Sequence, residues 1–425
     1  MADRNSLTRT EISWILYDVA NSAFVLIIVT TVLPIFFKDI ASRGIPDHVS
    51  TANWGFANSA ASLVLALLAP ILGALADYEG RKMKFFVGFI AIGVVFLLLL
   101  TQVGQGQWLL CLWLFAFARI GWAGANIFYD AFIVDVARTD RMDRVSSHGY
   151  AWGYIGSVVP FLLIIGLLFT APGRAGDAMP ELQAKIGFAI VAVWWLAFSV
   201  PMIRNVRQIH FIPSMGAPIL SGFKRLGGTF SRIRNHRQVF LFLAAYFFYI
   251  DGVDTIVTMA TAYGRDLGFS VALLIGVILF IQIIAFPFAL LYGKLAGRFS
   301  TKSMILAGIV IYSVTTFISF LLPSIDDPAL KTTAFWFMSF LLGSSLGGIQ
   351  ALSRSYFGKI IPVSSSAEFF GFYNVFGKFA AIMGPFLMGI TSRICGHSRW
   401  GVLSILVLFI IGAGLLSRVK EQAAA

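Results

Sequence analysis

Long apolar stretches recur along the whole chain. Most are about twenty residues or longer, the length that an α-helix needs to cross the ~30 Å hydrocarbon core of a bilayer at about 1.5 Å per residue. With 58% hydrophobic and 12% charged residues, the composition excludes a soluble globular protein. We therefore predict an all-α polytopic membrane protein with twelve transmembrane helices, at residues 12–38, 52–77, 84–103, 108–135, 146–170, 185–204, 238–262, 270–297, 302–322, 333–357, 367–393 and 398–417.

Basic residues concentrate on one side of this arrangement. Most of the 32 Lys and Arg residues fall at helix ends on the same side as the N-terminus. By the positive-inside rule this side faces the cytoplasm. We expect an integral multi-pass protein of the bacterial inner (cell) membrane with both termini cytoplasmic. The same placement accounts for the net charge of +12 without a nucleic-acid partner.

A basic segment divides the predicted helices into two sets of six. Residues 205–237 contain no acidic residue, so we expect a cytoplasmic linker there, between an N-terminal six-helix bundle at 1–204 and a C-terminal six-helix bundle at 238–425. Within the linker, residues 220–233 fit a short amphipathic helix that would lie on the anionic inner leaflet. A plain positive-inside linker explains the same charges equally well.

The two halves carry matching features. Gly73 to Asp77 lies at the end of the second predicted helix, and Gly293 to Gly297 occupies the matching place 220 residues later. Internal repeats of this kind build secondary transporters, whose substrate site lies at the interface between the repeats. The sequence therefore predicts two pseudo-symmetric bundles.

Two carboxylates lie near the middle of the seventh apolar stretch. Insertion scales assign about 3 kcal/mol to each charge at the bilayer centre, and the spacing of Asp251 and Asp254 puts both on one helix face. Asp18 and Asn21 in the first helix share this spacing. Such a face must look toward a protein interior or a watery cavity. The helix face with these carboxylates serves either transport or only helix packing through an interior ion pair.

Ionisable residues also occur in other predicted helices. Lys378 sits roughly 16 Å into the eleventh helix, which matches the depth of Asp251, so we predict that these two side chains approach each other. Arg119 and Arg354 are candidates for coupling, and a structural role stays open for Arg119 and Lys378. The candidate substrate- or proton-binding residues are Asp18, Asn21, Asn126, Asp130, Tyr150, Asp251, Asp254, Gln350, Tyr373, Asn374 and Lys378.

The loop after the second helix reads Gly73-Ala74-Leu75-Ala76-Asp77-Tyr78-Glu79-Gly80-Arg81-Lys82. It resembles the cytoplasmic loop signature of the major facilitator superfamily, except that Tyr78 stands where an arginine is usual. The resemblance implies that Asp77 meets the N-terminus of the eleventh helix. It also implies that Arg81 pairs with an acid at the inner end of the fourth helix, Asp135 or, as second choice, Asp130. The implied conformational latch consists of Gly73, Asp77, Gly80, Arg81 and Asp135.

Three further stretches narrow the resemblance. They are Ser13 to Ser22, Gly348 to Ser355 and Glu368 to Tyr373. All three are similar to one branch of the superfamily, the vacuole amino-acid-effluxer-like transporters and their bacterial relatives. The resemblance implies a secondary transporter, with amino acid export as the best-known activity of the branch.

These features predict a secondary active transporter that moves a small polar or zwitterionic solute, such as an amino acid, by alternating access with proton-coupled export. One alternative is an exporter of a drug, sugar, lipid or peptidoglycan fragment. An alternative of another class is a non-transporting membrane scaffold or receptor that docks through the basic linker. The chain has no nucleophile elbow or metal-ligand pattern, and Gly371 to Lys378 lacks the spacing of a phosphate loop. We therefore expect no enzyme, cofactor or metal, and a monomer whose partners are its substrate, protons and lipids.

Overall fold

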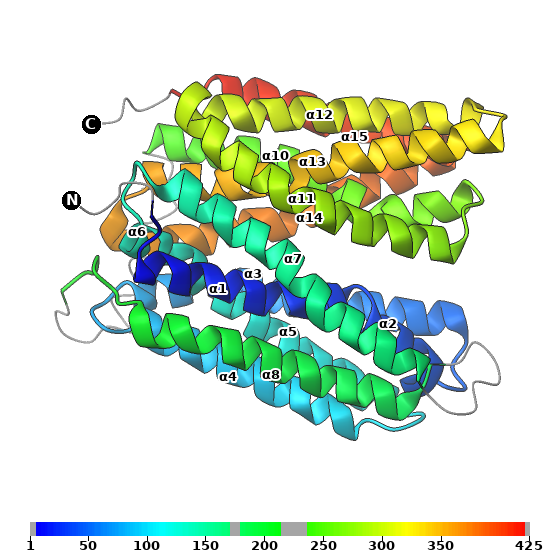
Figure 1. Ribbon diagram of the computed structural model, residues 1–425, viewed down its shortest axis with the longest axis horizontal. Coiled ribbons are helices and arrows are strands. Elements are labelled where there is room, and N and C mark those ends of the chain that lie inside the picture. Colours follow the sequence, from blue (N-terminus) through cyan, green and yellow to red (C-terminus); the bar gives the residue numbers. More distant parts are fainter. Residues whose placement is uncertain (1–5, 171–178, 214–235, 421–425) are drawn as a thin grey trace. The chain divides into compact units, whose positions relative to one another are not determined.

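The computed structural model describes residues 6–170, 179–213 and 236–420, which fold almost entirely into helices (Figure 1). Eleven of the described helical segments are long and apolar enough to cross a membrane. A further long helix, α14 (Ser366–Cys395), has 30 residues. The prediction of an all-α polytopic membrane protein is thereby confirmed. The amphipathic helix predicted at 220–233 lies outside the described residues.

The chain divides into two compact units. Unit 1 comprises Met1–Val136, Trp152–Ile219 and Ser364–Gly371, and unit 2 comprises Ala137–Ala151, Leu220–Val363 and Phe372–Ala425. The first turns of α7 (Met142–Phe169) therefore belong to unit 2, and the start of α14 belongs to unit 1.

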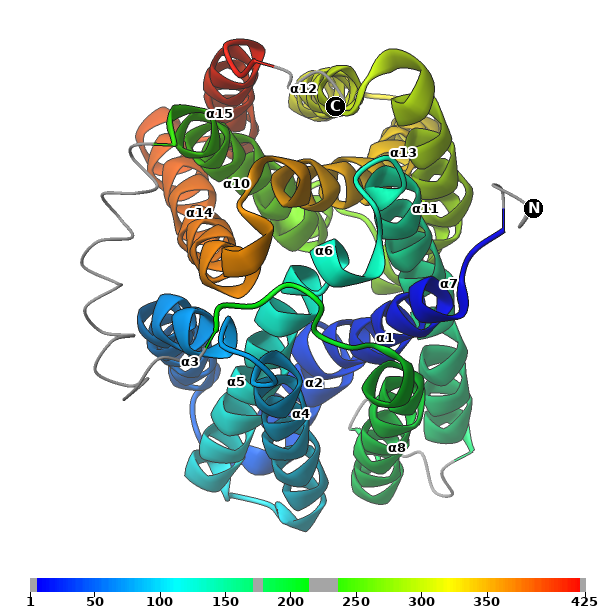
Figure 2. The ribbon, with the colours of Figure 1, turned by 90° about the vertical axis from the view of Figure 1, so that its left-hand side faces the viewer.

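Unit 1 has an aromatic core between α1 (Arg9–Ala23) and α5 (Trp108–Ala131). Trp14 stacks on Tyr129 with ring centroids 4.5 Å apart, and its indole N–H donates to the Tyr129 carbonyl at 2.9 Å. The helices α4 and α5 pack against each other, and α8 packs on both α1 and α4, as Figure 2 shows. The main helices of unit 1 are α1 (Arg9–Ala23), α3 (Asp47–Ala76), α4 (Lys82–Leu99), α5 (Trp108–Ala131), α6 (Ile133–Val136), most of α7, and α8 (Glu181–Asn205).

The first membrane span is not the single regular helix that its apolar run predicts. It begins with a capping box between Thr8 and Glu11 and changes to a π-helix at η1 (Phe24–Val29). The hydroxyls of Thr30 and Thr31 donate to the Leu26 carbonyl at 2.7 and 2.6 Å. Because these side chains replace backbone donors, the helix is interrupted there. The chain then continues through α2 (Val32–Phe36) and η2 (Phe37–Ala41).

Unit 2 contains a second set of long helices. In it α10 packs on α15, α11 packs on α13, and α12 packs on both α13 and α15 (Figure 2). Small polar residues start two of these helices, because Ser270 accepts the Leu273 N–H and Asp327 accepts the Ala329 N–H. Such caps satisfy donors that the first helical turn leaves free. The helices are α10 (Arg237–Asp266), α11 (Val271–Phe299), α12 (Thr301–Leu321), α13 (Pro328–Ile360), the remainder of α14, and α15 (Ser398–Ser417).

Candidate functional site

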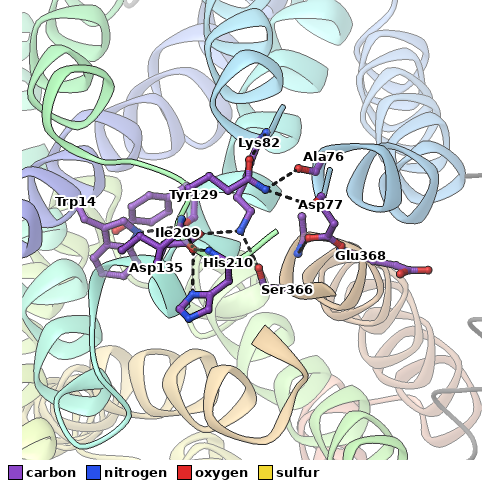
Figure 3. Close-up of polar contacts among 12 residues, drawn as sticks. Trp14, Ala76, Asp77, Lys82, Tyr129, Asp135, Ile209, His210, Ser366 and Glu368 are labelled. Atoms are coloured by element: carbon purple, nitrogen blue, oxygen red, sulfur yellow. Dashed lines mark hydrogen bonds and ion pairs between the residues drawn. The ribbon is translucent and has the colours of Figure 1, made fainter. Parts of the chain in front are cut away.

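Asp77 follows the last residue of α3 and binds the first turn of α14. Its Oδ1 accepts the Ala367 N–H at 2.8 Å, and its Oδ2 accepts the Glu368 N–H at 2.9 Å. The first N–H groups of a helix have no partner within the helix, and the helix dipole favours an anion at this end. Figure 3 shows Asp77 beside Glu368. The contact implied by the loop sequence is present.

Asp77 is completely buried. Burial raises the pKa of its carboxyl group from 3.8 to about 7, although the Lys82 ammonium and the N–H groups of Glu368 and Ala367 act to lower it. The loop beyond it turns at Gly80, whose φ of 67° lies in the left-handed region that favours glycine. Asp77 therefore titrates near neutral pH while it holds a helix end.

The ion pair at Asp135 differs from the predicted one. Lys82, not Arg81, places its Nζ 2.8 Å from Asp135 Oδ2, and both side chains are fully buried. The same ammonium donates to Ser366 Oγ at 2.8 Å (Figure 3). The Arg81 guanidinium lies over the Tyr78 ring at 5.9 Å instead. Arg81 is the cap of α4 and Lys82 its first residue, so the two side chains leave the helix in different directions.

The start of the linker forms a strap over this cluster, which sequence reasoning missed. Asp135 Oδ1 accepts the N–H groups of Ile209 and His210 at 2.9 and 2.8 Å, and His210 Nδ1 lies 3.2 Å from the same oxygen. The Ile212 N–H donates to the Asp77 carbonyl at 2.9 Å. The sequence signal was the polar pair of Gln208 and His210 directly after α8. We call Asp77, Lys82, Asp135, Ser366 and this strap the Asp77 cluster.

A second polar cluster lies in unit 2 at the first turn of α7. The two oxygens of Asp143 accept hydrogen bonds from Ser355 Oγ at 2.7 Å and Thr301 Oγ1 at 2.7 Å. The Lys359 ammonium pairs with the same carboxylate. These four residues come from α7, α12 and α13, and we call them the Asp143 cluster. None of them was among the candidate residues.

Arg354, predicted as a coupling residue, is buried and directly precedes Ser355 of this cluster. Its Nε donates to Ser146 Oγ at 2.9 Å and its Nη2 to the Ser146 carbonyl at 3.1 Å. The guanidinium carbon stands 4.4 Å from the centre of the Tyr150 ring, a cation–π distance. Two predicted site residues, Arg354 and Tyr150, are thus brought together at the start of α7.

The repeated glycines Gly73 and Gly293 make equivalent contacts in the two units. A Cβ on Gly73 would lie 2.3 Å from the Ala367 carbonyl oxygen, and a Cβ on Gly293 would lie 2.6 Å from Ser147 Cβ. Each glycine therefore lets its helix approach the first turn of another long helix closely. The repeat is not complete, because Gly297 of α11 stands where Asp77 stands in the first copy. In the second copy the carboxylate is that of Asp143, which belongs to α7, the helix that Gly293 contacts.

Within unit 1, five predicted site residues lie on α1 and α5. Asp18 is buried and its Oδ1 accepts the Asn21 Nδ2–H at 3.2 Å. Asn126 Oδ1 is buried without a hydrogen-bond partner in the described part of the chain, and Asp130 is half-buried. Arg119 donates to the neutral Ser62 Oγ at 3.3 Å, and among the described residues it has no carboxylate partner.

Within unit 2, Asp251 is buried and contacts α14. Its Oδ1 accepts the Gly384 N–H at 2.8 Å. Gly384 stands six residues beyond Lys378 in α14, which corresponds to about 9 Å of helix rise. The Lys378 side chain lies outside the described residues, and its pairing with Asp251 stays a prediction.

The other candidates of unit 2 lie on three helices. Tyr373 of α14 stacks on Tyr246 of α10 with centroids 4.2 Å apart and is buried. Asp254, Gln350 and Asn374 are half-buried. No group of three or more His, Cys, Asp and Glu residues that could hold a metal ion occurs in the described ranges.

The fold is that of major facilitator superfamily transporters. A proton:xylose symporter, XylE, matches with a TM-score of 0.73 at 12% identity over 97% of this chain and 95% of its own. A bacterial homologue of the iron transporter ferroportin matches with a TM-score of 0.70 at 16% identity, over 97% and 98%. At these identities the likeness establishes the fold alone.

The chain belongs to the family of vacuole effluxer Atg22-like proteins, whose model matches residues 49–425. It is 44% identical over 416 residues to the MFS-type transporter YxiO of Bacillus subtilis (strain 168), covering 98% of this chain and 96% of that protein. It is 27% identical over 292 residues to Autophagy-related protein 22-1 of Penicillium rubens, covering 64% of this chain and 48% of the fungal protein. The chain thus spans about half of that relative. The predicted family is confirmed.

Proposed function

We propose that this protein is a secondary active transporter that exports a small zwitterionic solute, an amino acid or a similar compound, by alternating access with proton coupling. The family name describes an effluxer, and one protein of the same fold is a proton:xylose symporter. Residence in the cell membrane with both termini cytoplasmic, a monomeric state and a lipid-facing basic linker belong to the same proposal.

The observation that carries the proposal is the state of Arg119. A half-buried guanidinium inside a membrane helix is costly unless an anion compensates it. Its described partner is the neutral Ser62 hydroxyl. A substrate carboxylate would complete this site through charge-assisted hydrogen bonds. Asn126, seven residues further on the same helix face, has a buried amide oxygen without a partner in the described residues, which suits an ammonium group of the same solute.

The Asp77 and Asp143 clusters support the alternating-access part of the proposal. Each holds the first turn of a long helix, α14 or α7, through a buried carboxylate. Alternating access requires helix ends on one side of the membrane to be held in one state and released in the other. In this proposal both clusters lie on the cytoplasmic side and act as latches, while a proton on a membrane-embedded acid links release to solute binding.

A transport experiment that compares a substitution of Arg119 with one of a control arginine tests which solute is transported. Purified protein in proteoliposomes is assayed for uptake of labelled amino acids after a thermal-shift screen of amino acids, peptides and sugars at two pH values. We expect R119Q to lower uptake at least about tenfold, since one charge-assisted hydrogen bond is worth roughly 1.5–3 kcal/mol. R43Q is the control, because Arg43 is exposed and bonds Gln105.

Two results would contradict the proposal. A thermal shift with sugars, drugs or lipids alone would assign a different cargo. No shift with any solute, together with a cellular phenotype that survives R119Q, would indicate a scaffold or receptor.

A further inference from the structure

One carboxylate oxygen of Asp251 has no hydrogen-bond partner among the described residues. The residue has no solvent exposure. Its Oδ1 accepts the Gly384 N–H at 2.8 Å and the Thr255 hydroxyl at 3.4 Å. Its Oδ2 is buried and has no hydrogen-bond partner in the part of the chain that the structure describes. A buried carboxylate oxygen without a donor is destabilising unless a cation or a proton neutralises it.

The backbone of α14 contacts the same carboxylate. The N–H of Gly384, which directly precedes Pro385, points to Asp251 and not only along its own helix. A carboxylate and a hydroxyl therefore meet at this turn. Hard cations prefer oxygen ligands of these types.

Glycine at position 384 is required for this arrangement. A Cβ there would lie 1.9 Å from Thr255 Oγ1 and 2.7 Å from Asp251 Oδ1. Any side chain would occupy the space between the hydroxyl and the carboxylate. The close approach of α14 to α10 is thus built into the sequence at the point where both polar groups face it.

Among the described residues, Asp251 forms no ion pair with a basic side chain. On α10 itself Asp254 follows one turn later and is acidic. The helix α12 contributes Tyr312, whose hydroxyl is buried without a hydrogen-bond partner among the described residues. The charged residue of α15 is Arg399, at its first turn. On α14, Lys378 stands six residues before Gly384, and its side chain lies outside the described residues.

We infer that Asp251, Thr255 and the α14 turn at Gly384 form a binding site for a small monovalent cation, H⁺ or Na⁺, which drives transport. The inference rests on the proposed function and specifies its coupling site. A proton would bond to Oδ2 without breaking any other bond. Sodium would bind the same oxygen together with the Thr255 hydroxyl, both of them oxygen ligands of the type that hard cations prefer.

The test uses purified full-length protein and measures thermal unfolding in equal concentrations of sodium, potassium or choline chloride, from about pH 5 to about pH 8. If sodium is the ligand, it raises the unfolding temperature of the wild type by about 2 °C or more over potassium. T255A diminishes this shift and D251N abolishes it. T258A is the matched control, because Thr258 is an exposed threonine of the same helix that bonds the Asp254 carbonyl.

If the proton is the ligand, sodium has no specific effect, and D251N flattens the dependence of the unfolding temperature on pH. Identical responses of wild type and D251N to both sodium and pH would overturn the inference. So would K378Q abolishing the same responses while the double variant D251N/K378Q regains wild-type stability, because Lys378 would then be the counter-ion. Counterflow exchange of solute needs no net cation movement, so exchange that persists in D251N separates a failed cation site from a failed carrier.

Discussion

Lys82 and Asp135 form an ion pair at 2.8 Å in which neither side chain is exposed. The Lys82 ammonium also reaches Ser366 at the start of α14, while the second oxygen of Asp135 accepts two backbone N–H groups of the strap. One pair thus connects three segments that are far apart in the sequence. A buried charge with several donors around it is sensitive to the loss of a single partner.

Removing one member of this pair should destabilise unit 1 strongly. We expect K82M and D135N each to cost about 3–5 kcal/mol, because each leaves an uncompensated buried charge. The double variant K82M/D135N should recover part of this loss. Thermal or denaturant unfolding of the four proteins in a double-mutant cycle measures the coupling. R81Q is the control, since Arg81 rests on Tyr78. A larger loss in R81Q than in K82M would show that Arg81 forms the pair.

The contact of Asp77 with α14 should depend on pH. Its pKa is about 7 when the carboxyl group is buried at the helix end and would return toward 3.8 on release. At pH values between about 4 and about 7, the Asp77 carboxyl group is protonated while it contacts α14 and ionised when the contact is released. Stabilisation of the contact is therefore fully present below about pH 4 and is lost as the pH rises through about 7, by at most about 1.4 kcal/mol per pH unit.

Hydrogen exchange at the amides of Ala367 and Glu368 measures this effect, after correction for the intrinsic pH dependence of exchange. We expect protection to fall with rising pH in the wild type and to stay flat in D77N. E79Q, which changes an exposed carboxylate two residues away, should behave as the wild type. Protection that increases with pH would mean that the helix end prefers the ionised carboxylate.

The extent of sequence prediction can be judged from these residues. The transmembrane helices follow from apolar length alone, and the contact of Asp77 with the first turn of α14 follows from a loop signature whose chemistry is local. The loop signature does not predict whether Arg81 or Lys82 pairs with Asp135, because this depends on the direction in which adjacent side chains leave the start of α4. The interruption after Val29 was missed because threonine hydroxyls compete with the backbone only in a specific rotamer.

Long-range contacts were harder to predict for a different reason. The Asp143 cluster combines residues of α7, α12 and α13 that have no common spacing. Its carboxylate belongs to the helix start itself, whereas Asp77 follows α3 and binds the start of another helix, α14. Two helices can be staggered by more than a turn without any sequence signal, so a shared level for Asp251 and Lys378 stays a prediction. Contacts between helices depend on packing, which periodicity does not encode.

The Asp143 cluster should stabilise unit 2 through its carboxylate more than through its ammonium. The side chain of Asp143 is 11% exposed and that of Lys359 21%, and two hydroxyls also donate to Asp143. We expect D143N to cost about 2–3 kcal/mol and K359M about 1 kcal/mol. D140N is the control, because Asp140 forms an exposed pair with Arg138 and should change stability by less than about 1 kcal/mol. Equal effects of D140N and D143N would contradict this assignment.

The two repeated glycines should tolerate alanine far less than their neighbour Gly297. A methyl group at Gly73 meets the backbone of Ala367 at 2.3 Å, and one at Gly293 meets Ser147 at 2.6 Å, whereas nothing lies within 4 Å of a Cβ at Gly297. We expect G73A to cost more than G293A, because a backbone carbonyl cannot move aside as a side chain can, with both in the range of about 1–3 kcal/mol for overpacking. G297A should be neutral or stabilising by about 0.5–1 kcal/mol, since alanine favours a helix. Thermal unfolding ranks the three variants. If G297A proved as harmful as G73A, close packing would not explain why glycine stands at positions 73 and 293.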